Sequence, residues 1–288
     1  MTTALVLGAA GGVGRAVVAR LAAGGGMRVV AVDQDPAVLQ LADASAALVG
    51  DVTEPGLLAR AFEAAGDEPP SVLVHALLYE LRAPLGELSP EQWHKVFDVG
   101  LVSAWQAAAE LVRRKGEGPA SVVLVGSVHA HGAVPGCAPY AVAKAGLGAL
   151  ARAAATEWGP LGVRTNVVEP GFVPVPRNAH RVPDDAARAR VAAHYPLGRI
   201  CSPAEIADAV AFLAGPTSSY VNGVCLPVDG GYLAVLPEVT PTSSDAPSSP
   251  TADLSGPTAD PSSPTADPSS PAADPSSPAG GLSSPAGD

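Results

Sequence analysis

The sequence is poor in cysteine and aromatic residues, and it contains no long hydrophobic run. Its three cysteines among 288 residues are far apart and form no CxxC pair. This argues against a disulfide framework or a thiolate metal site, so we expect no metal and a reducing compartment. No apolar stretch reaches the roughly 20 residues of a transmembrane helix, and no basic segment precedes the apolar N-terminus as in a signal peptide. These absences predict a cytoplasmic protein with no membrane partner.

Positive charge is scarce as well. Seven of the 28 acidic residues and none of the 17 basic residues lie from Pro237 onward, which leaves residues 1–236 with a net charge of −4. Neither part shows the clustered Lys and Arg of a nucleic-acid binder. We therefore expect no nucleic-acid partner.

The composition changes abruptly near residue 236. Residues 237–288 hold 12 of the 30 prolines. A seven-residue repeat there keeps four aspartates in register, at Asp253, Asp260, Asp267 and Asp274. Proline and the lack of apolar positions exclude a coiled coil. We predict one catalytic domain over 1–236 and a disordered low-complexity tail over 237–288, either an inert extension or an interaction tail.

Residues 1–236 alternate short apolar runs with helical stretches. The predicted strands are Ala4–Leu7, Arg28–Val32, Ala46–Val49, Ser71–His75, Ser121–Val125, Val163–Val168 and Val224–Pro227. Helical stretches begin near Val13, Pro36, Glu54, Pro90, Tyr140 and Pro203. Two of these starts, after Ser89 and Ser202, have the pattern of a capping box. The alternation predicts an α/β fold with a parallel sheet covered on both faces.

A glycine-rich turn follows the first predicted strand. Gly8, Gly12, Val13 and Gly14 lie where that strand meets a helix. Glycine lets the backbone approach a pyrophosphate closely, and the helix N-terminus supplies free N–H groups. The alternative is a merely tight structural turn, but the strand–turn–helix context favours dinucleotide binding.

The second strand leads to Asp33, about 20 residues beyond the glycine turn. A carboxylate there accepts hydrogen bonds from both ribose hydroxyls of NAD and repels the additional phosphate of NADP. We therefore predict NAD(H) as cofactor, with NADP(H) as the alternative. Asp33 is also placed to cap the next turn, before Asp35 and Pro36.

Tyr140 and Lys144 are one helical turn apart, so they share a helix face. A lysine charge about 4 Å from a phenol is worth roughly 4 kcal/mol, or about three pKa units, which predicts a Tyr140 pKa near neutrality. Such a group suits general acid–base catalysis. Ser127 lies just past the fifth predicted strand, at the ligand-binding edge of a doubly wound sheet. We predict that these three residues are catalytic.

The chain resembles the short-chain dehydrogenase/reductase family over essentially all of residues 1–236. The motifs that carry the resemblance are the Gly8/Gly12/Gly14 turn, Asp51-Val52, Gly126-Ser127, Tyr140 with Lys144, Asn166 through Pro170-Gly171, and Val228-Asp229-Gly230-Gly231. The resemblance implies a Rossmann fold with seven parallel strands in the order 3-2-1-4-5-6-7. It also implies hydride transfer between a nicotinamide cofactor and a small-molecule carbonyl or alcohol, in a homodimer or homotetramer built on two long helices.

The resemblance assigns roles to individual residues. Tyr140 would be the acid/base, Lys144 would also hold the nicotinamide ribose, and Ser127 would orient the substrate. Further cofactor contacts are implied for Asp51 and Val52 beside the adenine, and for Pro170, Gly171 and Val173 along the nicotinamide.

Some positions depart from the family pattern. The segment His75–Leu78 replaces the family's Asn-Asn-Ala-Gly and adds bulk beside the cofactor. Gly100 replaces the asparagine of the proton relay and has no side chain to hold a helix kink or a water. We expect cofactor binding to be retained and the relay to be altered, with water, His129 or His131 in its place.

The substrate segment 172–196 contains Arg177 and Arg181, which suggest either a polar or anionic substrate or only a solvated helix. Two other functions stay open. The first is non-redox chemistry on the same scaffold, such as a dehydratase or epimerase. The second is a non-catalytic dinucleotide sensor, which retention of Ser127, Tyr140 and Lys144 together argues against. The fold alone does not decide between them.

Overall fold

The computed structural model of the protein describes residues 2–236, so the predicted tail over 237–288 lies outside the described residues. Seven strands form one parallel sheet in the order β3-β2-β1-β4-β5-β6-β7, which confirms the predicted topology. The strands are β1 (Thr3–Leu7), β2 (Arg28–Asp33), β3 (Ala46–Val49), β4 (Val72–His75), β5 (Ala120–Val125), β6 (Val163–Pro170) and β7 (Cys225–Val228).

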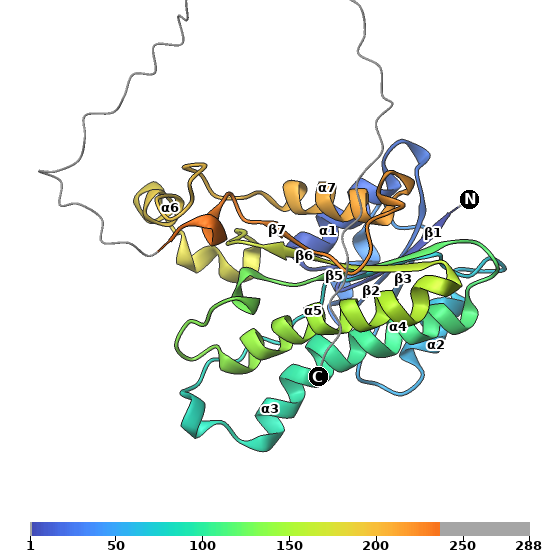
Figure 1. The fold of residues 1–288 in the computed structure, drawn as a ribbon, viewed down its shortest axis with the longest axis horizontal. Helices are drawn as coiled ribbons and strands as arrows, with labels where there is room; N and C mark the ends of the chain where they lie inside the picture. Colours follow the sequence, from blue (N-terminus) through green and yellow to red (C-terminus); the bar gives the residue numbers. More distant parts are fainter. Residues whose placement is uncertain (1, 237–288) are drawn as a thin grey trace, which may run out of the picture. The chain divides into compact units, whose positions relative to one another are not determined.

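Helices cover both faces of the sheet. The helices are α1 (Gly12–Ala22), α2 (Leu57–Glu63), α3 (Pro90–Phe97), α4 (Ser103–Arg114), α5 (Ala138–Trp158), α6 (Asp185–Ala192) and α7 (Pro203–Ala214). In Figure 1, α1 and α7 lie on one face, while α2, α4 and α5 lie on the other. This is the doubly wound arrangement that the alternating pattern predicts.

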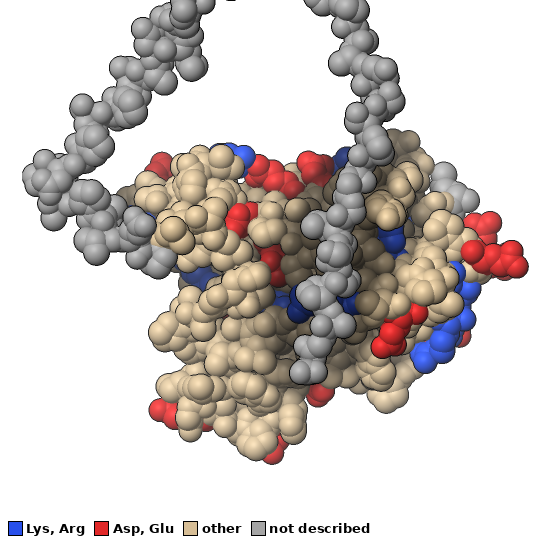
Figure 2. All heavy atoms as spheres, in the orientation of Figure 1, with Lys and Arg blue, Asp and Glu red and all other residues tan. Residues whose placement is uncertain are grey.

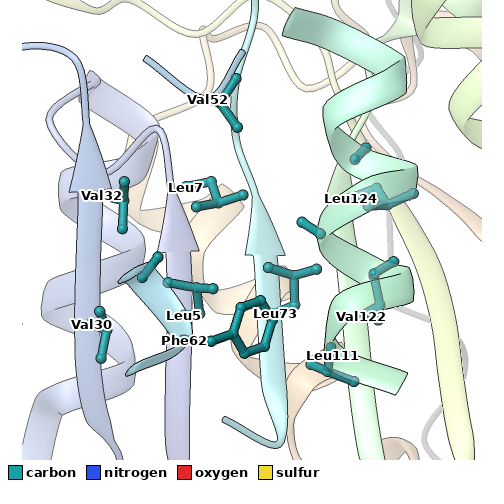
Figure 3. Packing of buried hydrophobic residues seen from close by; sticks show 14 of the residues in the cluster. Leu5, Leu7, Val30, Val32, Val52, Phe62, Leu73, Leu111, Val122 and Leu124 are labelled. Carbon is teal, nitrogen blue, oxygen red and sulfur yellow. The ribbon is translucent and has the colours of Figure 1, made fainter. Parts of the chain in front are cut away.

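The central strand β1 shows why both faces need cover. Ala4 and Val6 belong to the hydrophobic cluster under α1 and α7. Leu5 and Leu7 belong to the cluster under α2, α4 and α5, whose packing is seen in Figure 3. Side chains alternate across a strand, so a strand that is apolar at every position buries both sets of side chains only between two helical layers.

The predicted capping boxes are present at the N-termini of two helices. Ser89 caps α3, because its hydroxyl accepts the Gln92 N–H and the Gln92 side chain accepts the Ser89 N–H. Ser202 and Glu205 form the same reciprocal box at α7. The helix predicted near Pro36 is instead a short 3₁₀ segment over Pro36–Gln40. Asp35 caps its N-terminus, but the chain turns extended again at Leu41, so an α-helix does not develop.

A π-helical segment over Asp98–Val102 joins α3 to α4 and contains Gly100. The kink therefore forms without a side chain at that position. The Ser103 hydroxyl donates to the Val99 carbonyl at 2.7 Å and lies 2.8 Å from Nε2 of His75. The Ser103 hydroxyl thus links the Val99 carbonyl in the π-helical segment to His75 on β4.

Charged side chains of both signs are scattered over the face of the described residues that Figure 2 shows. The described residues also include no helix long and apolar enough to cross a membrane. Within residues 2–236 no three His, Cys, Asp or Glu side chains are grouped as metal ligands, and all three cysteines are free.

Candidate active site

A cavity of about 880 Å³ opens at the carboxyl ends of the central strands. Ligands of doubly wound sheets bind at this edge, where the strand order reverses between β1 and β4. Every site residue predicted from the sequence lines the cavity: Gly8, Gly12, Val13, Gly14, Asp33, Asp51, Val52, Ser127, Tyr140, Lys144, Pro170, Gly171 and Val173. The structure therefore brings together residues from six separate parts of the chain.

The glycine turn is shaped for close backbone approach. Gly8 has φ +85°, a conformation that favours glycine, and a Cβ on Gly14 would lie 2.0 Å from the Gly8 carbonyl oxygen. Gly11, the N-cap residue of α1, has no side chain and makes no side-chain capping hydrogen bond. These features fit a dinucleotide pyrophosphate, which needs exposed N–H groups at a positive helix end.

The segment after β6 lies directly over this turn. A Cβ on Gly12 would meet Cγ1 of Val175 at 2.4 Å. Val175 is also the residue before the 3₁₀ segment Pro176–Arg181. The segment that follows β6 therefore contacts the first turn of α1, although the two are far apart in the sequence.

Two carboxylates mark the other end of the cofactor groove. Asp33 accepts the Ala10 N–H with Oδ2 and the Asp35 N–H with Oδ1, both at 2.9 Å. It thus caps its own turn, as the sequence allows, and its side chain lines the cavity. Asp51 accepts from the Thr53 N–H and lies 3.3 Å from the Lys95 ammonium. These contacts hold the pKa of Asp51 below its usual value, with the Thr53 backbone hydrogen bond as the main cause.

The two leucines that follow β4 leave the groove open. Leu77 is partly buried and packs against the hydrophobic cluster under α2, α4 and α5. Its carbonyl oxygen accepts a hydrogen bond from Nζ of Lys144 at 3.3 Å. Leu77 and Leu78 both line the cavity, together with Gly8 and Tyr140. The added bulk narrows the groove without closing it.

Lys144 is almost completely buried, with 2% of its surface exposed. Its ammonium donates to the Val125 carbonyl at 2.6 Å as well as to Leu77. Burial, with a smaller contribution from the charge of Arg177, lowers the pKa of Lys144 to about 7. Near neutral pH this side chain therefore exchanges its proton readily, unlike an exposed lysine.

Tyr140 lies beside Lys144, whose Nζ is 5.7 Å from the centroid of the phenol ring. The predicted shift of its pKa toward neutrality is wrong in direction, because burial raises the pKa of Tyr140. Ser127 and Arg177 oppose this rise but do not reverse it. The lysine does not lower the phenol's pKa as expected, since its own charge is weakened by burial and is directed at two carbonyls. Tyr140 is protonated at neutral pH and suited to donate a proton.

Ser127 and His129 complete the surroundings of the phenol. Ser127 is buried, and its hydroxyl oxygen accepts the His129 N–H at 3.2 Å. The His129 ring meets the edge of the Tyr140 ring at a centroid distance of 5.4 Å. Burial, and then the charges of Arg82 and Arg181, lower the pKa of His129. A neutral imidazole beside the phenol is available to exchange protons.

Two further histidines near the site, His131 and His75, have different partners. His131 bonds Glu169 at 2.7 Å, and that carboxylate is 1% exposed. His75 is completely buried, and its pKa falls to about 3 through burial and the charge of Lys144. It is therefore neutral and supports the π-helical segment through Ser103. His75 stands where the family has an asparagine, and the sequence alone assigns it no role. The structure gives it this supporting one.

Sequence reasoning missed several residues that line the cavity. Among them are Glu80, Lys95 and Tyr195. The Tyr195 hydroxyl accepts the Phe172 N–H at 2.7 Å. Glu80 follows β4 closely, so its place at the carboxyl edge of the sheet was a usable signal. Lys95 and Tyr195 come from outside any motif.

Comparison with known proteins agrees with this geometry. A family model described as enoyl-(acyl carrier protein) reductase matches residues 8–233. The cis-4-hydroxycyclohexanecarboxylate dehydrogenase of Sinomonas cyclohexanicum is 36% identical over 243 residues, covering 81% of this chain and 96% of the relative.

Solved structures also resemble the chain. The gluconate 5-dehydrogenase of Burkholderia cenocepacia, in complex with NADP and tartrate, superposes with a TM-score of 0.72 at 28% identity, covering 82% of this chain and 96% of its own. The aldohexose dehydrogenase of Thermoplasma acidophilum reaches a TM-score of 0.75 at 27% identity, covering 83% and 97%. This chain belongs to the short-chain dehydrogenase/reductase family of oxidoreductases.

Proposed function

We propose that the protein transfers a hydride between NAD(H) and the carbonyl or secondary alcohol of a small molecule. The observation that carries this proposal is the shared cavity: Ser127, Tyr140 and Lys144 face the same space as the Gly8–Gly14 turn. A tyrosine, a serine and a buried lysine around one opening are the groups needed to bind a carbonyl oxygen and move its proton.

Each side chain has a separate task. When bound, the nicotinamide accepts or supplies the hydride. In alcohol oxidation, Tyr140 takes the hydroxyl proton as the carbon loses its hydride, and in reduction it returns that proton to the oxygen. Ser127 binds the same oxygen and orients it. Lys144, fixed by the Val125 carbonyl, holds the ribose and supplies positive charge when protonated.

The preference for NAD(H) rests on the charges beside β2. Asp33 and Asp35 both line the cavity there, with Gln34 between them. Lys95, a basic residue that lines the cavity, is paired with Asp51, and the Nε of Arg15 donates to the Ala10 carbonyl at 2.7 Å. A 2′-phosphate at the end of β2 would therefore meet the carboxylates of Asp33 and Asp35. The Burkholderia neighbour holds NADP, so this preference requires a direct test.

The relatives also suggest a substrate class. The Sinomonas enzyme is named for a cyclic hydroxy acid, and the Burkholderia enzyme for an open-chain sugar acid. A secondary alcohol that also carries a carboxylate is therefore the first substrate to try.

The test combines cofactor binding with turnover. NADH and NADPH are titrated by fluorescence, and alcohol oxidation is followed at the nicotinamide absorbance. Tyr140→Phe should abolish oxidation and leave NADH affinity within about twofold, while Tyr220→Phe, fully exposed and outside the cavity, is the matched control. Wild-type turnover by the Tyr140→Phe variant would refute the mechanism. Binding of NADPH without binding of NADH would refute the cofactor assignment.

We also propose a homodimer or homotetramer formed through α4 and α5. Trp105 on α4 is 52% exposed and Val142 on α5 is 47% exposed. Large apolar side chains on neighbouring helices favour burial against a second copy. Light scattering of the wild type and of Trp105→Glu tests this, since the variant should shift toward the monomer.

A further inference from the structure

Three arginines converge on one carboxylate at the substrate end of the cavity. Glu80, five residues after β4, forms ion pairs with Arg177 and Arg181 of the segment Pro176–Arg181. Arg82 lies 3.4 Å from the same carboxylate. All four residues line the cavity. The cluster thus joins two segments that lie about a hundred positions apart in the sequence.

The cluster carries an excess of positive charge. Three guanidinium groups face one carboxylate, and the other acidic residues that line the cavity, Asp33, Asp35 and Asp51, belong to the cofactor half. Burial would raise the pKa of Glu80, but Arg177 and Arg181 outweigh it and hold the pKa below its usual value. Glu80 therefore stays charged and neutralises only part of the cluster.

The arginines also act on the catalytic side chains. The charge of Arg177 opposes the rise that burial causes in the pKa of Tyr140, and it adds to the lowering of the pKa of Lys144. The charges of Arg82 and Arg181 add to the lowering of the pKa of His129, whose ring contacts Tyr140. Arg177 and Arg181 also line the same cavity as Tyr140, so a molecule bound in that cavity faces both the phenol and the guanidinium groups.

We infer that Arg177 and Arg181 bind a carboxylate of the substrate, and that Glu80 is the internal carboxylate that holds these guanidinium groups until the substrate takes its place. The inference rests on the proposed function, because it places the anionic end of a hydroxy acid opposite its reacting alcohol. A planar guanidinium binds a carboxylate through two parallel hydrogen bonds, so one carboxylate readily substitutes for another.

The exposures of the partners permit this exchange. The side chains of Glu80, Arg177 and Arg181 are 34%, 48% and 33% exposed. A displaced Glu80 is therefore able to turn toward water or toward Arg82, and no charge is left buried without a partner. The guanidinium groups of Arg177 and Arg181 are paired at every stage of this exchange, either with Glu80 or with the carboxylate of the substrate.

The test measures binding without turnover, so that it is separate from the test of hydride transfer. Cyclohexanecarboxylate and cyclohexanecarboxamide, which have no alcohol to oxidise, are titrated calorimetrically into the full-length protein with saturating NADH. The wild type should bind the carboxylate at least about tenfold more tightly than the amide. Arg177→Met and Arg181→Met should each remove most of this preference and leave amide binding within about twofold.

Two further variants sharpen the result. Glu80→Gln keeps the shape but removes the competing charge, so carboxylate binding should strengthen by about threefold or more. Arg188→Met, on the exposed surface of α6 and outside the cavity, is the control for loss of one arginine and should change nothing. Thermal unfolding of each variant excludes loss of folded protein as the cause.

The outcomes separate the two proposals. Equal affinity for acid and amide, no binding of either, or weaker carboxylate binding by Glu80→Gln would overturn the inference. Carboxylate-selective binding that depends on both arginines, in a protein that oxidises no alcohol, would overturn the proposed hydride transfer and leave the anion site standing.

Discussion

The buried ammonium of Lys144 makes the stability of the protein depend on pH. Its pKa is about 7 in the folded protein against an ordinary value of 10.5. Between these values the unfolded chain holds a proton that the folded chain has lost, so stability rises with pH across this window. The free energy of unfolding increases by about 1.4 kcal/mol per pH unit within this window. Between about pH 6 and about pH 9 the increase is about 2.7 kcal/mol.

Lys144→Met isolates this contribution. The variant keeps the length of the side chain but has no proton to bind, so its stability should lack the rise that the wild type shows. Reversible urea unfolding of both proteins at several pH values gives the difference directly. Lys115→Met, at the C-terminal end of α4, controls for the loss of one lysine. Groups that titrate in all three proteins cancel in the comparison.

The reasoning fails if the wild type and Lys144→Met change in parallel with pH. Parallel curves would mean that water reaches the ammonium in the folded protein and solvates it. A wild type that loses stability relative to the variant as pH rises would be a stronger refutation, because it would mean that the fold stabilises the charged lysine.

Three further predictions concern the same region. Because burial raises the pKa of Tyr140, kcat/KM for alcohol oxidation should keep rising with pH past about 9, and a plateau near neutrality in steady-state assays would contradict this. Gly12→Ala should weaken NADH binding at least about tenfold and lower stability by about 1–3 kcal/mol, because its Cβ would overlap Val175. Gly116→Ala, with open space around it, should leave fluorescence titrations and melting unchanged. His131→Ala should cost about 1–3 kcal/mol in urea unfolding, because it removes one of the hydrogen-bond partners of buried Glu169. An unchanged midpoint would show that Cys225, which also hydrogen-bonds this carboxylate, satisfies it alone.

Much of the fold is predictable from local patterns because the sheet is buried on both faces. Runs such as Ala4–Leu7 are apolar at every position, and only a two-sided sheet accommodates them. The capping boxes at Ser89 and Ser202 set two helix starts that are also predictable, because each box acts within four residues of sequence. The helix expected near Pro36 failed because its continuation depends on packing that the local sequence does not specify.

The candidate site was less predictable than the fold, since its electrostatics depend on burial. Spacing places Tyr140 and Lys144 on one helix face, but it does not show that Lys144 donates to strand carbonyls and loses much of its charge. The kink at Gly100 likewise depends on Ser103 and His75, which belong to different elements. Glu80 was missed because its importance comes from two arginines about a hundred positions away.

The contact between Gly12 and Val175 has a consequence for attempts to redesign this enzyme. The chain that roofs the phosphate end continues at once into the turn that carries Arg177. A library directed at residues 176–181 to change what the enzyme accepts will therefore also alter the roof above the dinucleotide. Cofactor affinity has to be screened beside substrate range, because one short stretch of backbone serves both.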